Sequence, residues 1–485
     1  MIQRCIFVTV LLLFSISFVD AQWMEELPLT TGTPRGWTGY ATGRGLEAEG
    51  DRVHAVIMDE RSGCWQPYYM RSTDGGASWG DAMLLTDTAE CYAGYPAICR
   101  DGMKLYVAWH REEGMDMDMY MRRSDDGGAT WSAKDTVTND EHIYEYTSIA
   151  VDGDVLHLVA AYKEILMTYS SDIYYLRSTD RGRSWQEGVK ISDAAERASL
   201  PCVRVSDGIV HVAWFDNDPS SRQLYYARST DGGDSWSAER QLTDAITFHA
   251  MPSLAADGLY LHIAYQVYVD GKWQIRLLSS EDYGESWSDA SLVVGEEGGS
   301  AVYPALVYAD SRLHMTWVDT RSGNYDACYA QSLDRGAHWS AVEVLGSDPG
   351  NATRPVIAVN GDAVHVMWLE NQGGTENVYY RRNPSRNVTG IHGSGIADTR
   401  DFGIRSVYPH PVRSGTTITY ALTHPGMVRV VVHDMLGRRV AELHEGVQAA
   451  GVHEITWRPN GLPPGSYFCR ITANDRSSVK LLLLR

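Results

Sequence analysis

The sequence predicts an all-β chain that forms a seven-bladed β-propeller, with six blades as the alternative, followed by a small Ig-like β-sandwich. Three observations predict it. One eight-residue motif recurs six times, at intervals of 51 to 54 residues. Seven alternating apolar strands follow Asp-Gly-like turns. The last 80 residues lack the motif and alternate between short strands and Gly/Pro turns.

Composition and charge exclude several classes of protein. The chain has 485 residues, of which 44% are hydrophobic and 21% charged, so it can bury a core and is not globally disordered. Its 42 Lys and Arg against 62 Asp and Glu give a net charge of −20. Residues 406–485 hold nine Lys/Arg and five Asp/Glu, or +4, which leaves −24 for the rest. We therefore expect no nucleic-acid partner, because such binding needs Lys and Arg to neutralise phosphates.

The first 21 residues have the pattern of a secretory signal peptide. Arg4 precedes an apolar run from Cys5 to Val19, which is short for a membrane span, and residues 19–21 fit a cleavage site. We therefore expect export, a mature chain that starts at Gln22, and no membrane span after the signal is removed.

The repeated motif reads S-x-D-x-G-x-[ST]-W, and only His338 departs from it. Ser and Asp side chains in such a segment bond nearby backbone donors and hold a tight turn. Gly permits a positive φ, and the Trp ring folds back over the hairpin. We therefore assign a structural role, not an acid/base role, to Asp74, Trp79, Asp126, Trp131, Asp180, Trp185, Asp231, Trp236, Asp282, Trp287, Asp334 and Trp339.

An alternating strand precedes each motif, and there is one strand more than there are motifs. The seven strands occupy 50–59, 101–110, 152–162, 207–215, 257–265, 310–318 and 360–369. The segment that starts at Trp23 resembles the strand that follows each motif, and from Trp23 to Asn387 is 364 residues, or seven periods of 52. We therefore expect a propeller over 22–388 in which the N-terminal strand completes the last blade.

The motif resembles the Asp-box of the bacterial neuraminidase repeat (BNR) family, so the chain resembles a sialidase-like β-propeller. The resemblance implies a ligand site on the face opposite the Asp-boxes. It also implies an exo-sialidase, which grips a carboxylate with three Arg and uses a Tyr nucleophile, an activating Glu and an Asp acid/base. The family opens with Arg-Ile-Pro, whereas this chain has Arg35-Gly36-Trp37 at the comparable place.

Residues 406–485, which follow a linker at 389–405, resemble the C-terminal sorting domain of the type IX secretion system. The landmarks are residues 408–411, Trp457 and residues 462–467, and the family has Asn where this chain has His410. The resemblance implies type IX secretion machinery as a partner. It also implies that the protein is secreted or held at the outer-membrane surface of a Bacteroidota-like bacterium.

Candidate ligand residues gather in the connections that lead into the first strand of each blade and in the loops of the same face. The catalytic candidates are Arg35, Arg197, Arg354, Tyr303 and Glu145. The rim candidates are Trp37, Trp65, Tyr92, Tyr95, Tyr144, Tyr146, His249 and Trp273. The Asp-x-Arg pairs at 59/61 and 319/321 are expected to order their loops as ion pairs.

These residues favour a binding protein over an enzyme, because any large propeller offers three rim Arg. We expect a monomeric, secreted or cell-surface protein that binds a glycan or another extracellular ligand on the rim opposite the Asp-boxes. The alternative is an exo-sialidase or other glycoside hydrolase, with an Arg cluster, a Tyr/Glu pair and an Asp acid/base.

Cysteine spacing predicts one disulfide and no metal site. Cys64 and Cys91 fall on the same rim of neighbouring blades, and export permits oxidation, so we predict that they are bonded. Cys99 and Cys202 fall on inner strands and are expected to be small buried hydrophobes. The sequence has no His/Cys cluster with zinc spacing and no phosphate-binding fingerprint, so no metal or cofactor is expected.

Overall fold

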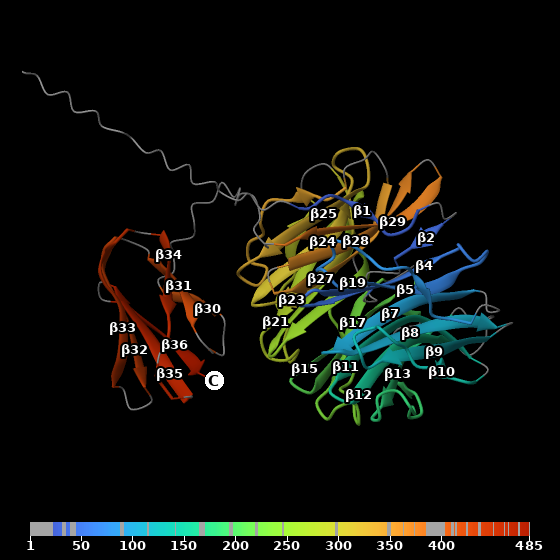
Figure 1. The fold of residues 1–485 in the computed structure, drawn as a ribbon, viewed down its shortest axis with the longest axis horizontal. Coiled ribbons are helices and arrows are strands. Elements are labelled where there is room, and N and C mark those ends of the chain that lie inside the picture. The colour runs from blue at the N-terminus through green and yellow to red at the C-terminus, as the bar shows by residue number, and fades with distance from the viewer. Residues whose placement is uncertain are drawn as a thin grey trace, which may run out of the picture. The chain divides into compact units, whose positions relative to one another are not determined.

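The computed structural model divides the chain into two compact units, Met1–Ile391 and His392–Arg485. It describes residues 23–31, 35–38, 45–87, 92–113, 116–140, 142–163, 170–193, 197–218, 222–244, 247–295, 299–346, 351–361, 363–372, 374–384, 403–408, 412, 415–422, 425–434, 438–449, 451–459, 461–463, 465–473 and 476–484. Every helix or strand assigned within these ranges is a strand, so the all-β prediction is confirmed (Figure 1). Residues 1–22, with the expected signal peptide, lie outside the described ranges.

The first unit is built from antiparallel modules of four strands each, numbered here along the chain. Module 1 contains β2 (Gly36–Trp37) and β3 (Leu46–Glu49), which together form its first strand, then β4 (Arg52–Asp59), β5 (Gln66–Ser72) and β6 (Met83–Leu84). Module 2 contains β7 (Ala93–Asp101), β8 (Lys104–Glu113), β9 (Asp116–Ser124) and β10 (Asp135–Thr136). Module 3 contains β11 (Ile143–Asp152), β12 (Val155–Lys163), β13 (Asp172–Ser178) and β14 (Val189–Lys190). A parallel pairing of Ile143 with Met117 joins modules 2 and 3 into one sheet.

Modules 4 to 7 repeat this order. Module 4 contains β15 (Ala198–Ser206), β16 (Ile209–Asp216), β17 (Leu224–Ser229) and β18 (Arg240–Gln241). Module 5 contains β19 (Phe248–Asp257), β20 (Tyr260–Val269), β21 (Lys272–Ser280) and β22 (Ser291–Val294). Module 6 contains β23 (Ala301–Ala309), β24 (Arg312–Asp319), β25 (Asp326–Ser332) and β26 (Glu343–Val344). Module 7 contains β27 (Asn351–Asn360), β28 (Ala363–Gln372) and β29 (Thr375–Asn383), and its fourth strand is β1 (Leu27–Pro28).

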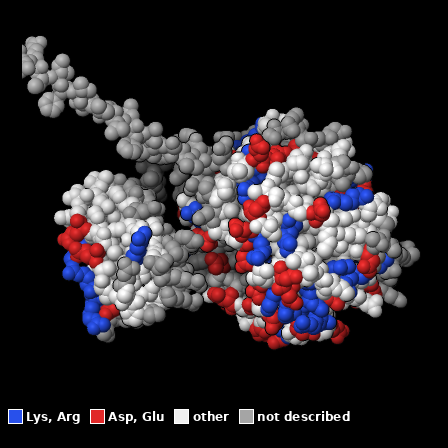
Figure 2. Space-filling model, in the orientation of Figure 1, with Lys and Arg blue, Asp and Glu red and all other residues white. Residues whose placement is uncertain are grey.

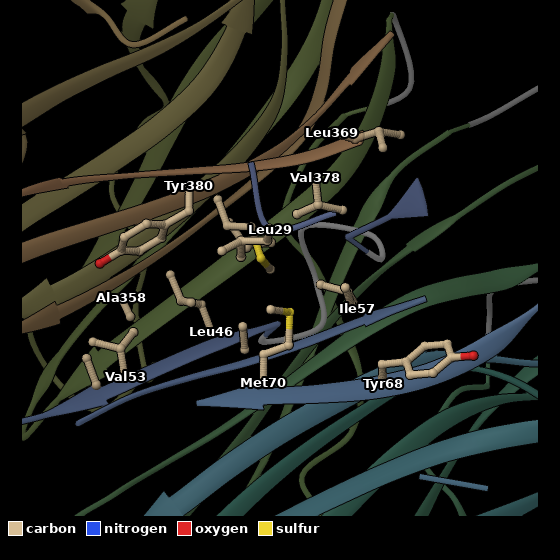
Figure 3. Packing of buried hydrophobic residues seen from close by; sticks show 14 residues of the cluster. Leu29, Leu46, Val53, Ile57, Tyr68, Met70, Ala358, Leu369, Val378 and Tyr380 are labelled. Carbon is tan, nitrogen blue, oxygen red and sulfur yellow. The ribbon is translucent and has the colours of Figure 1, made fainter. Parts of the chain in front are cut away.

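The two ends of the first unit meet in module 7. Leu27 pairs with Tyr380 and Pro28 with Tyr379, so the predicted pairing of the N-terminal segment with the last module is confirmed (Figure 1). The first strand of each module lies beside the first strand of the next, and β27 of module 7 lies beside β3 of module 1. One buried cluster spans modules 7 and 1, where Val378 and Tyr380 face Val53 and Met70 (Figure 3).

A tyrosine from the third strand of one module holds the Asp-box of the next. The Tyr380 hydroxyl of module 7 is hydrogen-bonded to His365 Nδ1 at 2.6 Å. The centre of its ring lies 4.9 Å from that of Trp79 of module 1, in an edge-on contact. A Cβ atom on the box glycine Gly76 would lie only 1.8 Å from the Tyr380 hydroxyl oxygen, so a side chain at this position would collide with the tyrosine. The same arrangement recurs with Tyr69, Tyr175 and Tyr226, which meet Trp131, Trp236 and Trp287. In module 6, Tyr329 meets Trp23, so the N-terminal segment replaces the missing seventh box tryptophan.

Each Asp-box carboxylate is occupied within its own turn. In the first box, Ser72 Oγ donates to Asp74 Oδ1 at 2.8 Å, and the Ser78 N–H and hydroxyl donate to the same carboxylate. These donors hold the pKa of Asp74 well below its usual range, and the Ser184 hydroxyl likewise lowers the pKa of Asp180 to about 2. In the first box the Gly75 N–H also donates to Asp51 O, so boxes lie on the same face as the turns between first and second strands.

The second unit contains two sheets with a shared core. One sheet has the order β30 (Gly403–Tyr408), β31 (Thr416–Leu422) and β34 (Gly451–Trp457). The other has the order β33 (Arg439–Gln448), β32 (Gly426–Asp434), β35 (Gly465–Ala473) and β36 (Arg476–Leu484). Trp457 of the first sheet and Tyr467 and Cys469 of the second are buried in one cluster. His410 lies outside the described residues.

The box glycines give a stability prediction with a matched control. Gly76→Ala and Gly50→Ala both place a side chain at positive φ, which costs about 1–2 kcal/mol. Only the Gly76 side chain also collides with Tyr380, whereas nothing lies within 4 Å of a Cβ at Gly50. Overpacking adds about 1–3 kcal/mol, so urea unfolding is expected to show the larger loss for Gly76→Ala. Equal losses for the two variants would show that Tyr380 does not hold the box.

The buried histidines give a prediction for acid stability. Burial lowers the pKa of His54 and His211 to about 3, and that of His157 and His365 to about 4, whereas an unfolded chain protonates near 6.5. Between pH 6.5 and 4 the unfolded chain therefore binds protons that the folded chain excludes, so the free energy of unfolding falls as pH falls.

The slope is about 1.4 kcal/mol per pH unit for each histidine in this window. We expect His211→Gln to reduce the slope of the free energy of unfolding against pH by up to about 1.4 kcal/mol per pH unit. Urea unfolding from pH 7 to pH 4 measures this slope. Parallel curves for the variant and the native chain would show that His211 is not kept neutral by burial.

Candidate functional site

The first strands share one irregularity near the end that lies away from the Asp-boxes. In modules 2 to 7, two consecutive residues of the first strand are left out of its pairing with the second strand. The first of the two has a positive φ in every case, although none is glycine: Tyr95, Tyr146, Leu200, Met251, Tyr303 and Arg354. A non-glycine residue in this conformation costs about 1–3 kcal/mol, and such strain, like such bulges, concentrates at functional sites.

Proline explains how the bulge is built. The second skipped residue is a proline in five of the six modules: Pro96, Pro201, Pro252, Pro304 and Pro355. Because proline has no N–H, it cannot bond the second strand at that point. The pairing of the two strands is interrupted there.

Neighbouring modules support these strained residues. The Tyr303 N–H donates to Gln266 Oε1 of module 5 at 2.9 Å, and the Tyr95 N–H lies 3.1 Å from Met58 Sδ of module 1. His110 is buried beside the Tyr95 ring at 5.0 Å, and burial lowers its pKa to about 4, so it is neutral. Tyr95 and Tyr303 are therefore held in place by these contacts.

Module 1 departs from the pattern and supplies a tryptophan instead. Its first strand is split between β2 and β3, which both pair with β4, and residues 39–44 between them lie outside the described ranges. Thr38 Oγ1 donates to the Arg354 carbonyl at 2.7 Å, which ties module 1 to the bulge of module 7. Trp37 thereby takes a place between the bulges of modules 7 and 2.

Five half-buried side chains form a continuous band, which we call the aromatic arc: Tyr303, Arg354, Trp37, Tyr95 and Tyr146. The Arg354 guanidinium lies 3.9 Å from the centre of the Trp37 ring and 5.7 Å from that of Tyr303. Trp37 meets Tyr95 edge-on at 6.1 Å, and Tyr95 meets Tyr146 at 5.5 Å. The arc thus runs across modules 6, 7, 1, 2 and 3, with one cation among four aromatic rings.

The structure brings some of the other predicted residues to the arc and leaves others apart. Trp65 joins it by an edge-on contact with Trp37 at 6.0 Å. Tyr92 is exposed, and His249 is buried with Nδ1 3.1 Å from the Arg222 carbonyl. Trp273 packs on Tyr268 of its own hairpin.

Two of the catalytic candidates, Tyr303 and Arg354, lie together in the aromatic arc. Glu145 accepts a bond from Lys163 at 2.5 Å, whereas Tyr303 contacts Arg354. Arg35 is exposed in the segment before β2, and the Arg197 N–H donates to Asp216.

Leu200 and Met251 were not anticipated, although their x-Pro pairs match those of the other modules. The recurrence of proline at the start of five first strands is the sequence signal that identifies them.

Ion pairs hold the loops around the arc. Arg61 bonds Asp59, which is fully buried, and Arg321 bonds Asp319 at 2.9 Å, so both predicted Asp-x-Arg pairs are confirmed. In the described part of the chain, no three His, Cys, Asp or Glu side chains are grouped to hold a metal ion. No helix there is long and apolar enough to cross a membrane.

Cys64 is disulfide-bonded, and its predicted partner Cys91 lies outside the described residues. The Ala93 N–H donates to the Trp65 carbonyl at 3.2 Å, so the chain just after Cys91 runs beside the chain just after Cys64. Cys99 and Cys202 are buried, as expected.

We expect alkylation and mass analysis of the native protein to label neither Cys64 nor Cys91 until a reductant is added. Cys202, which is buried and free, serves as the control and should be labelled only after denaturation, with or without reductant. Labelling of Cys91 in the unreduced, denatured protein would show that Cys64 has another partner.

Comparison with known proteins adds three findings. The BNR repeat-like domain model matches residues 10–224 and 212–383, and the secretion system C-terminal sorting domain model matches residues 406–485. A sialidase of Bacteroides fragilis (strain YCH46) is 23% identical in an alignment of 301 residues, and the match covers 51% of this chain and 54% of that protein. The chain thus spans about half the length of this curated relative.

Solved structures resemble the chain at low identity. A PL25 polysaccharide lyase, an ulvan lyase bound to -[GlcA(1-4)Rha3S]-, has a TM-score of 0.53 at 12% identity and covers 72% of this chain and 94% of its own. The NanB sialidase from Streptococcus pneumoniae has a TM-score of 0.43 at 11% identity, with 70% and 84% covered.

Proposed function

Because the chain belongs to the BNR repeat-like domain family and ends in a secretion system sorting domain, we propose that it is an exported glycan-binding protein whose ligand lies on the aromatic arc. The sorting domain indicates type IX secretion, with the protein secreted or held at the outer-membrane surface of a Bacteroidota-like bacterium. A glycan in the surroundings of the cell is a ligand that such a protein can reach.

We further propose that the seven modules close into a seven-bladed β-propeller. The contact of β27 with β3 supports closure, and so does the Tyr380–Trp79 contact between modules 7 and 1. Trp23 and β1 complete module 7 from the other end of the chain. In this arrangement the strained bulges surround the mouth of the channel on the face away from the Asp-boxes.

The arc itself is the observation that carries the binding proposal. Aromatic rings present large apolar faces with polar edges, which suit the alternating C–H and O–H surface of a sugar. Arg354 adds a planar cation that can bond a carboxylate or sulfate with two parallel N–H groups. Its position over Trp37 holds that cation within the aromatic surface.

Exo-sialidase chemistry is less well supported. It requires three Arg around one carboxylate and a Tyr beside an activating Glu. Arg354 alone among the three candidates belongs to the arc, and Glu145 is paired with Lys163. The charge of −24 outside residues 406–485 is also unfavourable for an anionic ligand, unless Arg354 offsets it locally. Positively and negatively charged side chains are interspersed on the face shown in Figure 2.

Substitutions in the arc test the proposal. On an array of sialosides, oligoglucuronides and neutral plant or host glycans, the native protein is expected to bind at least one class. Trp37→Ala is expected to weaken that binding about tenfold or more, since it removes the largest ring and exposes Arg354. Arg354→Met keeps the apolar stem of the side chain and should weaken the binding of acidic glycans more than that of neutral glycans.

Trp273→Ala is the matched control, because Trp273 packs on Tyr268 and not on the arc. Binding that survives Trp37→Ala but is lost in Trp273→Ala would place the ligand elsewhere. Steady turnover of any glycan on the array, abolished by Arg354→Met, would replace the binding proposal with an enzymatic one.

A further inference from the structure

Module 5 carries a row of three aromatic side chains that does not belong to the aromatic arc. Phe248 of β19 pairs with Tyr268 of β20, and Tyr268 pairs with Trp273 of β21. Residues that lie opposite each other in antiparallel strands point to the same side of a sheet, so the three rings share one face. The ring centres of Tyr268 and Trp273 lie 5.2 Å apart. Phe248 is 41% exposed and Tyr268 39% exposed, so a ligand can reach the row.

The repeat shows that the fold itself does not require an aromatic row at this place. Phe248 and Asn351 both lie three residues before the bulge residue of their module. In module 7 the equivalent row is polar, because Asn351 pairs with Asn371 and Asn371 with Glu376. The aromatic row is therefore a property of module 5 and not of the repeat.

A short hairpin turn holds the row in place. Asp270 and Gly271 at the tip of the hairpin have φ angles of 48° and 81°, which is the pattern of a type I′ turn. The Trp273 N–H donates to Ser300 Oγ of module 6 at 3.1 Å. The Asp-box of this module begins at Ser280, at the other end of β21. The row therefore lies at the same end of its module as the arc residues do in theirs.

A cation from module 4 extends the row by one position. The Arg222 carbonyl accepts the His249 N–H at 3.0 Å, which places Arg222 beside the start of β19. Its guanidinium carbon lies 5.3 Å from the centre of the Phe248 ring. Within the part of the chain that the structure describes, Arg222 Nε makes no hydrogen bond and the guanidinium makes no ion pair. This cation is therefore available to an anionic group of a ligand.

Other charged groups near the row decide where that anionic group lies. Burial lowers the pKa of His249, and the charges of Asp244 and Arg276 act on the same imidazole. His249 is the second residue of β19 and points to the face opposite the row. Asp270 is exposed at the hairpin tip, at the other end of the row from Arg222. An anionic group is therefore favoured at the Arg222 end.

We propose that Arg222, Phe248, Tyr268 and Trp273 form a second glycan site, separate from the arc, that binds an oligosaccharide with a carboxylate or sulfate group. The sugar rings lie on the aromatic side chains, and the anionic group bonds the guanidinium. Three strand spacings separate the two ends of the row, or about 14 Å, so several linked sugars fill it and a single sugar does not. The site uses no residue of the arc, so it holds or fails independently of the proposed function.

Calorimetric titration of the full chain tests the second site. The parent is the double variant Trp37→Ala/Arg354→Met, which removes the largest ring and the cation of the arc. The probes are a short oligoglucuronide, a sulfated oligosaccharide and a neutral oligosaccharide of equal length. At least one acidic probe is expected to bind the parent, and more tightly than the neutral probe. Adding Tyr268→Ala or Arg222→Met should weaken that binding about tenfold or more.

Tyr325→Ala is the matched control. Tyr325 is 48% exposed, and its carbonyl accepts the Ala352 N–H of module 7 as the Arg222 carbonyl accepts that of His249. It lies beside Asn351 and not beside an aromatic row, so its loss should leave binding unchanged. The same substitutions in the native chain give a second measurement, which does not depend on the folding of the double variant.

Three results would overturn the second site. They are no binding of either acidic probe to the parent, equal binding of the neutral and acidic probes, and unchanged binding after Tyr268→Ala and Arg222→Met. None of them bears on the arc, whose ligand is lost in Trp37→Ala. Conversely, a glycan that survives Trp37→Ala and is lost in Tyr268→Ala supports the second site even where the arc binds nothing.

Discussion

The contact between a tyrosine of one module and the Asp-box of the next is the interaction on which the rest of the first unit depends. The Tyr hydroxyl is fixed by a buried histidine and occupies the space beside the box glycine, as Tyr380 does beside Gly76. Any other residue there would meet the hydroxyl, so the glycine is required by its neighbour as much as by its turn. The box tryptophan then covers the same ring. Each module is thereby locked to the next at one face.

In two of the boxes another side chain takes the place of the tyrosine. Met121 of module 2 and Leu277 of module 5 occupy the place of the tyrosine, against Gly182 and Gly336. An apolar side chain of suitable length is therefore sufficient to hold the box, and the His–Tyr bond adds a polar tie where it occurs. Trp23 makes the last contact from outside the repeat, since it reaches Tyr329 and also donates to Glu343 at 2.6 Å.

Rigidity at the box face permits strain at the opposite face. Six non-glycine residues with positive φ at equivalent positions represent a cost that a loosely held sheet would relieve. The modules carry different side chains at this one position, so a symmetric scaffold presents an asymmetric surface. Polar and aromatic residues occupy it in modules 2, 3, 6 and 7, and Leu200 and Met251 occupy it in modules 4 and 5. The arc therefore spans modules 6, 7, 1, 2 and 3, and Trp37 fills the gap that module 1 leaves.

Much of this architecture could be predicted from the sequence, because it repeats. The repeated motif predicts the Asp-box turns, and the additional alternating strand predicts that β1 pairs with β29. The Asp-x-Arg spacing predicts the loop ion pairs of Asp59 and Asp319. The site was harder to predict. Type and position in the chain predict Tyr303 and Arg354 as catalytic candidates and Tyr95 as a rim residue. Their grouping around Trp37 depends on a bulge that alternation alone does not reveal.

Other side chains were ambiguous for a related reason. Tyr144 and His249 sit in the same connections as the bulge residues, yet both are buried. Tyr144 lies two residues before Tyr146, so strict alternation would place them on one face, and the bulge at Tyr146 breaks that alternation.

A crystal structure of the protein with a glycan from the array tests the central claim most directly. The account predicts a sugar ring against Trp37, with a polar or acidic substituent within hydrogen-bonding distance of Arg354. A ligand seated on the Asp-box face, or at a place that leaves Trp37 and Arg354 untouched, would contradict it.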